Sequence, residues 1–541
     1  MKNAPSRSDG RLSMVRTRRN DSSGLTVNPS NQGASCREHI YEDRTCLLEP
    51  SGTYYVRSGY PYVAMHGYSK CMNILLVAIN ARYTHSSLAL RYLRNALLAE
   101  ARLHGQNVEI QIREFNINQP RIELTRDIAA LAPDMLMGSC YIWNAEYFSA
   151  LLPDIRALLP ECRLVLGGPE VAYGADSWLA THAELDLVVS GSAEGAAVLL
   201  AARGFEPSSF PDRVMDAPFV PFSSVPFPYT DIDFKELEKR YLYYESSRGC
   251  PFRCSYCLSS REDQELDEKG LDSVIVELER IAAHEPFLVK FVDRSFNADP
   301  DRARAIWRHI IREHADGSTR YHFEVHPLFL TDDDFALLAN ASDGLFQFEL
   351  GVQTVHGATR QAIARGGDWP REREAIRRLM NVATVHVHVD LIAGLPGESI
   401  SDIGISYNEL MALKPDHLQL GFLKGLPGTS LRDKADSAAG MVTPERSLDF
   451  ALFQAKPSYE VLATGKLSTS DLGILKGVEE LVDGLYNSKR FRAEMERAAT
   501  RYGGYFEAYR MLREHCLAIG FEIRTRDRTK LAPMLSGWLE T

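Results

Sequence analysis

Three cysteines stand close together in the chain and have a spacing that suits a metal cluster. Cys250, Cys254 and Cys257 lie in the segment SSRGCPFRCSYC with the spacing C-x-x-x-C-x-x-C. Three thiolates on one loop suit a 4Fe-4S cluster in which one iron has no protein ligand. Such an iron can chelate the amino and carboxylate groups of a substrate, much as a catalytic zinc keeps one position open. The spacing therefore indicates an iron–sulfur centre.

A structural zinc site and three unrelated cysteines are the alternatives. Structural zinc normally takes four protein ligands arranged as two C-x-x-C pairs, and the chain has no second pair. The remaining cysteines of the nine are scattered, at positions 36, 46, 71, 140, 162 and 516, which is not the pattern of a disulfide framework. We expect the protein in the cytoplasm, because the chain shows neither a membrane-spanning run nor a secretory signal. In such a reducing compartment a tight cysteine cluster usually means metal binding or redox chemistry.

Composition limits the class of partner. The chain has 541 residues, 45% of them hydrophobic, and a formal net charge of -11. This acidic balance argues against a surface that binds mainly by neutralising nucleic-acid phosphates. No apolar run approaches the roughly 20 residues that a membrane-spanning helix needs, and no secretory signal follows the basic N-terminus. We therefore expect neither a membrane nor a nucleic acid as the default partner.

The chain divides into segments of different pattern. Strand-like and helix-like stretches alternate from Met72 to Phe205, which predicts a doubly wound parallel sheet. Its ligand-binding rim is expected at four loops: 80–87, 138–144, 167–174 and 190–195. The predicted divisions are a disordered or mis-assigned extension (1–71), a Rossmann-like domain (72–205), a Pro-rich linker (206–240), a second α/β domain (241–435) and a mostly helical C-terminal domain (436–541).

The second domain has the pattern of a partial (β/α)6 barrel. The strands YLYYES, FLVKFVD, YHFEV, LFQFELGV, VHVHVDLIAG and HLQLGFLKG alternate with helical stretches. The cysteine loop follows the first strand, at the carboxyl-terminal rim where barrels hold their chemistry. The last domain reads as helical through YEVLATG, with a strand, FEIRTR, expected near its end.

The cysteine segment resembles the signature of the radical S-adenosylmethionine superfamily. Further residues of the barrel resemble the branch that includes oxygen-independent coproporphyrinogen oxidase. The resemblance implies an S-adenosylmethionine site made of Tyr244, Tyr256, Asp293, Glu324, Gln353, Arg365 and Asp390. By resemblance, Glu324 and Asp293 hold the methionine amino group and Arg365 the carboxylate. Gln353 and Asp390 match groups near the ribose. Taken singly, each residue also reads as an ordinary helix cap or strand-end polar group.

A doubly wound domain before such a barrel resembles the cobalamin-binding class of these enzymes. The segments LGGPEVAYG and SGSAEG look like the last two rim loops of that domain. The resemblance implies a cobalamin site with the residues Tyr141, Ile142, Trp143, Gly167, Gly168, Pro169 and Gly191. The motif D-x-H-x-x-G is absent after the first strand, so we expect no histidine ligand below the ring, and His85 is a poor substitute. A bound nucleotide and an unliganded domain are the alternatives.

Three functional hypotheses follow. The first is a 4Fe-4S-dependent enzyme that reductively cleaves S-adenosylmethionine and, with cobalamin, methylates or rearranges a small-molecule or peptide substrate. It takes electrons from an external one-electron donor such as flavodoxin or ferredoxin. The second is a tRNA-modifying methylthiotransferase, a family that carries extra cluster cysteines before its barrel. The third, a non-catalytic iron–sulfur or zinc protein, leaves the later strand-end residues unexplained. The C-terminal helices resemble a domain of unknown function that accompanies the cobalamin class.

Overall fold

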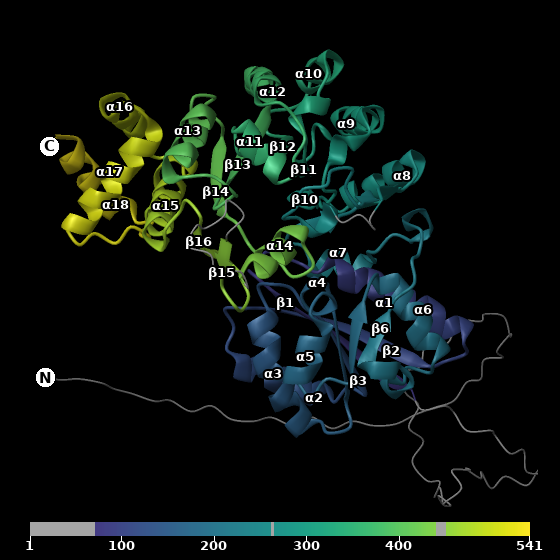
Figure 1. Ribbon diagram of the computed structural model, residues 1–541. Coiled ribbons are helices and arrows are strands. Elements are labelled where there is room, and N and C mark those ends of the chain that lie inside the picture. Colours follow the sequence, from purple (N-terminus) through teal and green to yellow (C-terminus); the bar gives the residue numbers. More distant parts are fainter. Residues whose placement is uncertain (1–70, 261–264, 440–450, 541) are drawn as a thin grey trace, which may run out of the picture. The chain divides into compact units, whose positions relative to one another are not determined.

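Two parallel sheets followed by a group of helices make up the chain (Figure 1). The computed structural model describes residues 71–260, 265–439 and 451–540. The predicted extension, residues 1–71, lies outside this range except for Cys71. The predicted fold class, a doubly wound sheet followed by a partial barrel and a helical domain, is confirmed.

The first sheet is doubly wound, with its six strands in the order β2-β1-β3-β4-β5-β6 and every pair parallel. The strands are β1 (Met72–Asn80), β2 (Val108–Asn116), β3 (Met135–Ser139), β4 (Arg163–Gly167), β5 (Leu187–Ser190) and β6 (Val214–Asp216). The helices are α1 (Leu88–Leu103), α2 (Arg121–Leu131), α3 (Ala145–Leu158), α4 (Pro169–Ala172), α5 (Ala175–Thr181) and α6 (Ala193–Ala202).

Strand β1 is apolar on both faces because helices cover both sides of the sheet. Its side chains point alternately to opposite faces. Leu75, Val77 and Ile79 enter a core that includes residues of α2 and α3. The intervening side chains, such as Leu76, enter a second core with residues of α1 and α6. The continuous run ILLVAI is therefore the expected signature of a strand buried on both faces.

The segment 206–240, predicted as an extended linker, contains regular structure. Strand β6 pairs with β5 and continues the first sheet. Helix α7 (Asp231–Glu236) begins at a capping box between Thr230 and Asp233. Asp233 also accepts hydrogen bonds from Arg94 of α1 at 2.8 and 2.7 Å. The short apolar strand and the local cap were hidden in the Pro-rich composition of this segment.

The second sheet is a partial barrel whose strands follow chain order, β7-β10-β11-β12-β13-β14, all parallel. The strands are β7 (Leu242–Tyr244), β10 (Leu288–Phe291), β11 (Arg320–Glu324), β12 (Phe346–Gln353), β13 (Val385–Ala393) and β14 (His417–Phe422). Strands β8 (Ser247–Arg248) and β9 (Asp267–Glu268) form a separate antiparallel pair. The helices are α8 (Leu271–Ala282), α9 (Pro300–His314), α10 (Asp332–Leu338), α11 (Gly357–Ala362), α12 (Trp369–Val382), α13 (Ile400–Met411) and α14 (Ser430–Ala439).

One face of the second sheet is apolar and the other is polar. Alternate residues of β12 and β13 are buried. They pack with residues of the surrounding helices, such as Trp307 of α9. The intervening positions carry polar side chains, which we call the polar face: Lys290, His322, Glu324, Gln347, Glu349, His386, His388, Asp390 and His417.

The C-terminal domain is mostly helical but departs from the predicted pattern in two places. Its elements are the hairpin of β15 (Ala451–Phe453) and β16 (Val461–Thr464), then α15 (Thr469–Val482), the π-helix η7 (Asp483–Asn487), α16 (Arg492–Tyr502), α17 (Tyr505–Ala518) and α18 (Arg528–Glu540). YEVLATG, predicted within the helical part, contains β16. FEIRTR, predicted as a strand, contains none, and no strand of the described residues lies beside it to pair with. Its exposed Arg524 side chain lies 3.2 Å from Glu480 of α15.

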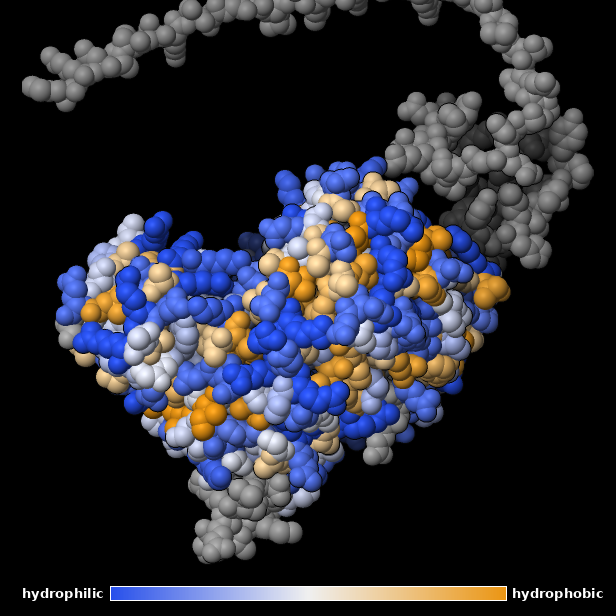
Figure 2. Space-filling view, turned by 90° about the horizontal axis from the view of Figure 1, so that it is seen from above, coloured by the Kyte–Doolittle hydropathy of each residue, from blue (hydrophilic) through white to orange (hydrophobic). Residues whose placement is uncertain are grey.

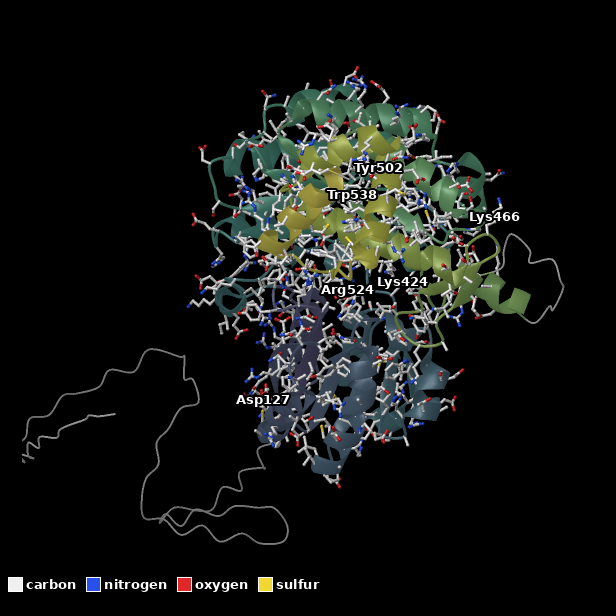
Figure 3. The ribbon with its side chains drawn as sticks, turned by 90° about the vertical axis from the view of Figure 1, so that its left-hand side faces the viewer. Asp127, Lys424, Lys466, Tyr502, Arg524 and Trp538 are labelled. Atoms are coloured by element: carbon white, nitrogen blue, oxygen red, sulfur yellow. The ribbon has the colours of Figure 1, made fainter. Side chains whose placement is uncertain are left out.

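Single-turn helices complete the described elements: η1 (Pro207–Ser209), η2 (Pro211–Arg213), η3 (Phe222–Ser224), η4 (Leu258–Ser260), η5 (Phe296–Ala298) and η6 (Pro327–Phe329). The last helix is attached by an aromatic contact. The rings of Tyr502 on α16 and Trp538 on α18 stack with centroids 5.2 Å apart (Figure 3). Trp538 is buried, so this contact closes the C-terminal helical group.

Exposed apolar side chains are distributed over several elements. Leu103, Phe219 and Ile232 are among the most exposed of them. On the face that Figure 2 presents, hydrophobic areas are small and separated by hydrophilic ones. Among the described residues, no helix combines the length and the apolar character that crossing a membrane requires.

The edge of the second sheet at β14 is covered by the C-terminal domain. The side chain of Asn487, in the π-helix, makes the two backbone hydrogen bonds that a neighbouring strand would make. Its Oδ1 accepts from the Leu418 N–H at 3.0 Å and its Nδ2 donates to the Leu418 carbonyl at 2.9 Å. Beyond β14, Val461 of β16 donates to the Leu423 carbonyl at 2.9 Å. The two contacts satisfy backbone groups that an edge strand otherwise leaves open.

We expect the substitution Asn487→Ala to destabilise the chain by about 1–2 kcal/mol, because two hydrogen bonds to the edge strand are lost. The midpoint of chemical denaturation, followed by circular dichroism, measures the change. Asn340→Ala is the matched control, since exposed Asn340 makes a single local hydrogen bond to the Ala336 carbonyl. Equal midpoints for the two variants would show that Asn487 does not hold the sheet edge.

Candidate functional site

The three clustered cysteines lie on one loop after β7. Cys250 and Cys254 are each 6% exposed and Cys257 is half-buried. All three are free thiols. Gly249 precedes them with φ +85°, and a Cβ there would lie 2.2 Å from the Glu265 carbonyl oxygen. Position 249 therefore requires glycine, because the loop backbone there lies directly against the backbone of the segment that leads to β9.

Asp293, at the end of β10, organises the start of this loop. Its buried carboxylate accepts hydrogen bonds from the Ser246 N–H at 3.0 Å, the Ser246 hydroxyl and the Ser247 hydroxyl at 2.7 Å. Burial raises the pKa of Asp293, and these hydrogen bonds oppose the rise. The carboxylate is therefore engaged by the loop itself, which indicates a role in shaping the cysteine loop.

Arg248 connects the cysteine loop to the first domain. Its Nη1 and Nη2 donate to the two carboxylate oxygens of Glu194, on α6, at 3.1 and 2.9 Å. Its Nε donates to Glu245 at 3.0 Å. The guanidinium also lies over the Phe222 ring, 4.2 Å from its centroid. The bidentate pair with Glu194, the hydrogen bond to Glu245 and the stacking on Phe222 together fix the orientation of the guanidinium.

Polar groups from three elements meet beside the Cys254 sulfur. Arg365, after α11, lies with Nη1 3.8 Å from Cys254 Sγ, and its Nη2 donates to the Gly351 carbonyl of β12. The Tyr256 hydroxyl also bonds this sulfur. Burial raises the pKa of Cys254, whereas Arg365 and Tyr256 lower it. The predicted residues Cys254, Tyr256 and Arg365 are thus brought together.

Gln353 and Asp390 lie at the same rim with unused hydrogen-bonding atoms. Gln353 ends β12 at an irregularity in the register and has φ +69°, an uncommon conformation for a side chain of this kind. Gln353 Oε1, Asp390 Oδ1 and Arg365 Nε are all buried without a protein partner. Buried polar atoms are nearly always paired, so three orphans at one rim indicate a place for a polar ligand.

Two acids of the polar face have raised pKa values. Burial raises the pKa of Glu324 to about 7, although Arg294, with Nη1 3.4 Å from Glu324 Oε1, opposes the rise. Burial, together with the negative charge of Glu349, raises the pKa of Asp390 well above its usual range. Perturbed carboxyl groups of this kind cluster at functional sites.

Tyr244, also predicted for the S-adenosylmethionine site, lies elsewhere. It is fully buried on the helix-facing side of β7, in the apolar core. Its hydroxyl donates to Glu277 of α8 at 2.6 Å, and the same carboxylate binds Lys269 at 2.9 Å. The Tyr244 hydroxyl is thus engaged in the core, and of the other predicted residues Asp293 acts electrostatically on it.

The polar face also carries residues that the sequence analysis did not single out. His388 stacks on His417 with ring centroids 4.6 Å apart, and Gln347 Nε2 lies 2.9 Å from His388 Nε2. His322 Nε2 lies 3.0 Å from Glu349 Oε2. Burial and the neighbouring histidines lower the pKa of His388 to about 3, so this imidazole is neutral at pH 7. The alternation in VHVHVD and FQFELG was a signal for these positions.

The aromatic residues predicted for cobalamin form a flat pair after β3. The rings of Tyr141 and Trp143 stack in parallel, 4.4 Å between centroids at 6°, and Trp143 is 45% exposed. Trp143 Nε1 donates to the Ile79 carbonyl at 3.2 Å, and Ile142 between them is half-buried. The pair therefore presents an aromatic surface at the end of the first sheet.

The glycines of the predicted cobalamin loops are required by contacts within the chain. Gly168 has φ +107°, and a Cβ there would lie 2.5 Å from the Cys140 carbonyl oxygen. At Gly191, with φ +97°, it would lie 3.0 Å from the Ala217 carbonyl oxygen. At Gly167 a Cβ would make only ordinary contact with Val189, and Pro169 begins α4. Packing against neighbouring backbone therefore requires glycine at positions 168 and 191.

The predicted rim loops of the first sheet contact the rest of the described chain. His85 Nδ1 bonds the Tyr243 hydroxyl of β7 at 2.6 Å. Tyr459, beside β16, donates to Glu170 of α4. Tyr141 and Glu245 act electrostatically on Arg294 at the barrel rim. These contacts, together with that of Arg248, place the first sheet's rim against the barrel. His85, with its Nδ1 held by a tyrosine, remains a poor axial ligand.

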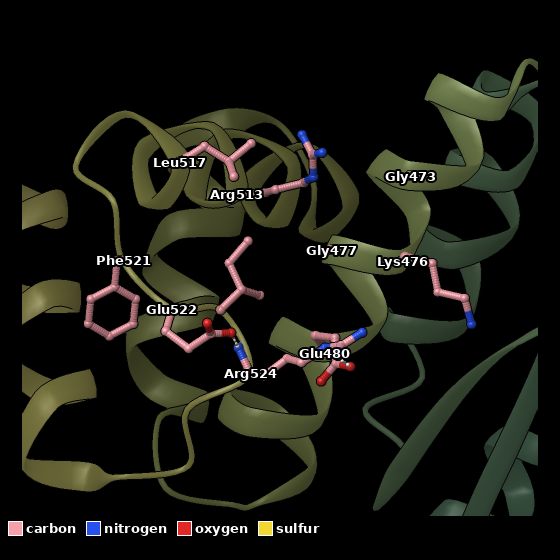
Figure 4. Close-up of a pocket in the computed structure, with 10 residues that line it drawn as sticks. Gly473, Lys476, Gly477, Glu480, Arg513, Leu517, Phe521, Glu522 and Arg524 are labelled. Atoms are coloured by element: carbon pink, nitrogen blue, oxygen red, sulfur yellow. Dashed lines mark hydrogen bonds and ion pairs between the residues drawn. The ribbon is translucent and has the colours of Figure 1, made fainter.

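A cavity of about 280 Å³ lies in the C-terminal domain. It is lined by residues of α15 and α17 and of the segment before α18, including Lys476, Arg513 and Leu517 (Figure 4). Ion pairing between Arg524 and Glu480 borders it. None of the predicted site residues lies in its lining, so the cavity is separate from the cysteine loop.

Three family models match consecutive parts of the chain. The model of the B12 binding domain matches residues 74–201, that of the Radical SAM superfamily residues 244–410, and that of a protein of unknown function, DUF4080, residues 451–540. Each match coincides with one of the structural parts described above.

Curated relatives resemble the chain over part of their length. The cobalamin-dependent radical SAM methyltransferase TokK of Streptomyces tokunonensis is 24% identical over 307 residues, 49% of this chain and 43% of that protein. The ribosomal protein uS12 methylthiotransferase RimO of Shewanella oneidensis is 26% identical over 277 residues, 48% of this chain and 56% of that protein. The chain thus spans about half the length of these relatives.

Solved structures share the fold at low sequence identity. The radical S-adenosylmethionine methyltransferase TsrM of Kitasatospora setae superposes with a TM-score of 0.55 at 17% identity, over 72% of this chain and 78% of that one. The cobalamin-dependent S-adenosylmethionine radical enzyme OxsB gives a TM-score of 0.56 at 12% identity, over 87% of this chain and 75% of that one. The chain thus combines a B12 binding domain, a Radical SAM domain and a DUF4080 domain in that order, and it shares its fold with cobalamin-dependent radical S-adenosylmethionine enzymes.

Proposed function

We propose that the chain reductively cleaves S-adenosylmethionine at a 4Fe-4S cluster held by Cys250, Cys254 and Cys257, and transfers a methyl group to an unactivated carbon with the help of cobalamin. The observation that carries the proposal is that Arg365, which contacts Cys254, shares the rim with Gln353 and Asp390, and that each of these three residues has a buried atom without a protein partner. A cluster supplies single electrons for breaking a sulfonium bond, and cobalamin supplies a methyl carrier.

The residues around Cys254 fit the polar end of S-adenosylmethionine. Arg365 Nε faces no protein acceptor and can donate to the methionine carboxylate. Glu324 can accept from the methionine ammonium, whose positive charge would keep that carboxylate ionised. Asp390 Oδ1 and Gln353 Oε1 are free to accept from ribose hydroxyls. Asp293 contributes by holding Ser246 and Ser247 at the start of the loop.

The aromatic pair fits the flat face of a corrin ring. Tyr141 and Trp143 stack on each other, and Trp143 is the more exposed ring. Neither supplies a metal-ligating nitrogen, so the lower face of the ring would rest on apolar surface. Gly168 and Gly191 serve the loop backbone that supports this surface.

The partners and location follow from the same chemistry. The cluster needs an external one-electron donor such as a flavodoxin or ferredoxin, and the substrate is a small molecule or a peptide. The cysteines of the described residues are all free thiols, which supports a reducing compartment, the cytoplasm.

Methylthiotransferase activity is the second candidate, because RimO proteins are among the relatives. That function needs further cluster cysteines before the barrel. In the described part of the first domain, Cys140 and Cys162 are buried and far apart in sequence, and the chain after the barrel is mostly helical. These features favour methyl transfer.

The substitution Cys254→Ala is expected to abolish both the absorbance of the reconstituted cluster and the formation of 5′-deoxyadenosine or S-adenosylhomocysteine from S-adenosylmethionine. Iron content, the visible spectrum and chromatography of the products measure the effect under anaerobic conditions. Cys71→Ala, at a half-buried cysteine away from the loop, should leave both unchanged. Turnover by Cys254→Ala at the rate of the unaltered chain would exclude the proposed cluster.

Replacing Gln353 by Ala should raise the Kd for S-adenosylmethionine about tenfold, because one hydrogen bond worth about 1 to 1.5 kcal/mol is lost. Equilibrium dialysis of the cluster-loaded chain with labelled S-adenosylmethionine measures the affinity. Gln361→Ala, on the exposed side of α11, is the control. An unchanged Kd for Gln353→Ala would remove this residue from the site while leaving the cluster in place.

For cobalamin, Trp143→Ala should weaken binding about tenfold, since a loss of 1.4 kcal/mol of stacking and burial corresponds to that factor. Retention of hydroxocobalamin by the full chain on a desalting column, read by absorbance, is the measurement. Trp143→Phe preserves a ring and should bind nearly as the unaltered chain does. Phe219→Ala removes another exposed aromatic ring and serves as control. Equal retention by all variants would contradict a cobalamin face at Trp143.

A further inference from the structure

Two histidines and a glutamate meet on the outer helical layer of the barrel. Glu279 lies on α8, and His309 and His314 lie in the last turns of α9. One ligand atom from each falls within 4.8 Å of the other two. Glu279 Oε1 is 2.6 Å from His309 Nε2 and 3.1 Å from His314 Nε2. The three groups thus converge from two neighbouring helices.

The orientation of His314 is set from behind by a tyrosine. The Tyr321 hydroxyl lies 2.7 Å from His314 Nδ1, and Tyr321, in β11, is fully buried. With Nδ1–H donating to that hydroxyl, His314 Nε2 carries a lone pair directed toward Glu279 and His309. Histidines that bind metals almost always have their second nitrogen held in this way.

Burial and charge around the three groups suit a cation. The side chains of His314 and His309 are 6% and 11% exposed, whereas that of Glu279 is 51% exposed. The charged groups acting on His314 are Glu279, His309 and Glu313. Those acting on Glu279 are the two histidines. The half-exposed Glu279 leaves one side of the three groups open to water.

We propose that Glu279, His309 and His314 bind one Zn²⁺ ion that joins α8, α9 and the start of β11. Two imidazole nitrogens and one carboxylate oxygen are a ligand set that zinc accepts, and water at the exposed side completes four-coordination. The site is separate from the cysteine loop, and the proposal does not depend on the function proposed above.

The position indicates a structural role. Helices α8 and α9 pack side by side in the layer outside β10 and β11. Tyr321 lies at the beginning of β11, and Glu324 of the polar face ends the same strand. A metal that ties the two helices to Tyr321 therefore stabilises the frame that carries Glu324.

The test measures zinc bound by the cluster-loaded chain after equilibrium dialysis against micromolar Zn²⁺, by elemental analysis. The unaltered chain should retain one equivalent more than His309→Ala and than Glu279→Gln, and its thermal midpoint should rise with zinc while theirs do not. Tyr321→Phe keeps all three ligands and should lower the affinity about tenfold, since second-shell groups contribute 10–100-fold. Circular dichroism verifies that each variant is folded.

Two controls separate this site from others. His104→Ala removes an exposed histidine of the first domain and should leave zinc binding unchanged. The triple variant Cys250→Ala, Cys254→Ala, Cys257→Ala should still bind the one equivalent of zinc. This result would show that the zinc is not held by the cysteine loop. Equal zinc content in the unaltered chain, His309→Ala and Glu279→Gln would overturn the proposal and leave a hydrogen-bonded triad in its place.

Discussion

The Arg248 guanidinium holds the position of the cysteine loop relative to the first domain. It pairs with Glu194 of one domain and Glu245 of the other while lying over Phe222. Two carboxylates brought into a partly buried place cost free energy unless a cation compensates them. Removal of Arg248 would leave Glu194 without this ion-pair partner and would deprive Glu245 of its hydrogen-bonded cation. The loop that carries the cysteines therefore cannot shift independently of α6, which ties the proposed cluster to the proposed cobalamin domain.

The same rim shows how parallel sheets assemble a site from distant parts of the sequence. Parallel strands deliver their carboxyl ends to one edge, so Gln353 and Asp390, 37 positions apart, share a rim with Arg365 and the cysteine loop. The fold positions these groups without satisfying all of their hydrogen bonds. Most buried polar atoms in proteins are paired. The unpaired atoms at this rim are therefore available to the ligand proposed above.

Sequence reasoning reached the two parallel sheets, because an uninterrupted apolar strand such as ILLVAI and the regular return of helices leave few other folds. The spacing assigned Cys254 and the family resemblance assigned Arg365, Gln353 and Asp390, which remain predictions for the ligand site. Sequence reasoning missed β6, whose three residues are too few for a periodic signal. It placed a strand at FEIRTR, where no strand of the described residues is available as a partner. Tyr244 was assigned by resemblance, which does not reveal the direction of its side chain; in the structure its hydroxyl is directed to Glu277.

The π-helix at Asp483–Asn487 has a consequence for association between chains. A parallel sheet that does not close into a full barrel ends in a strand whose backbone N–H and C=O groups can template pairing with another molecule. Here the side-chain amide of Asn487 hydrogen-bonds to the backbone N–H and C=O of Leu418. The chain at the start of β16 pairs with the backbone just beyond β14. The DUF4080 domain thus shields the barrel from edge-to-edge aggregation, and an enzyme of this architecture that lost it would need another cover for the same strand.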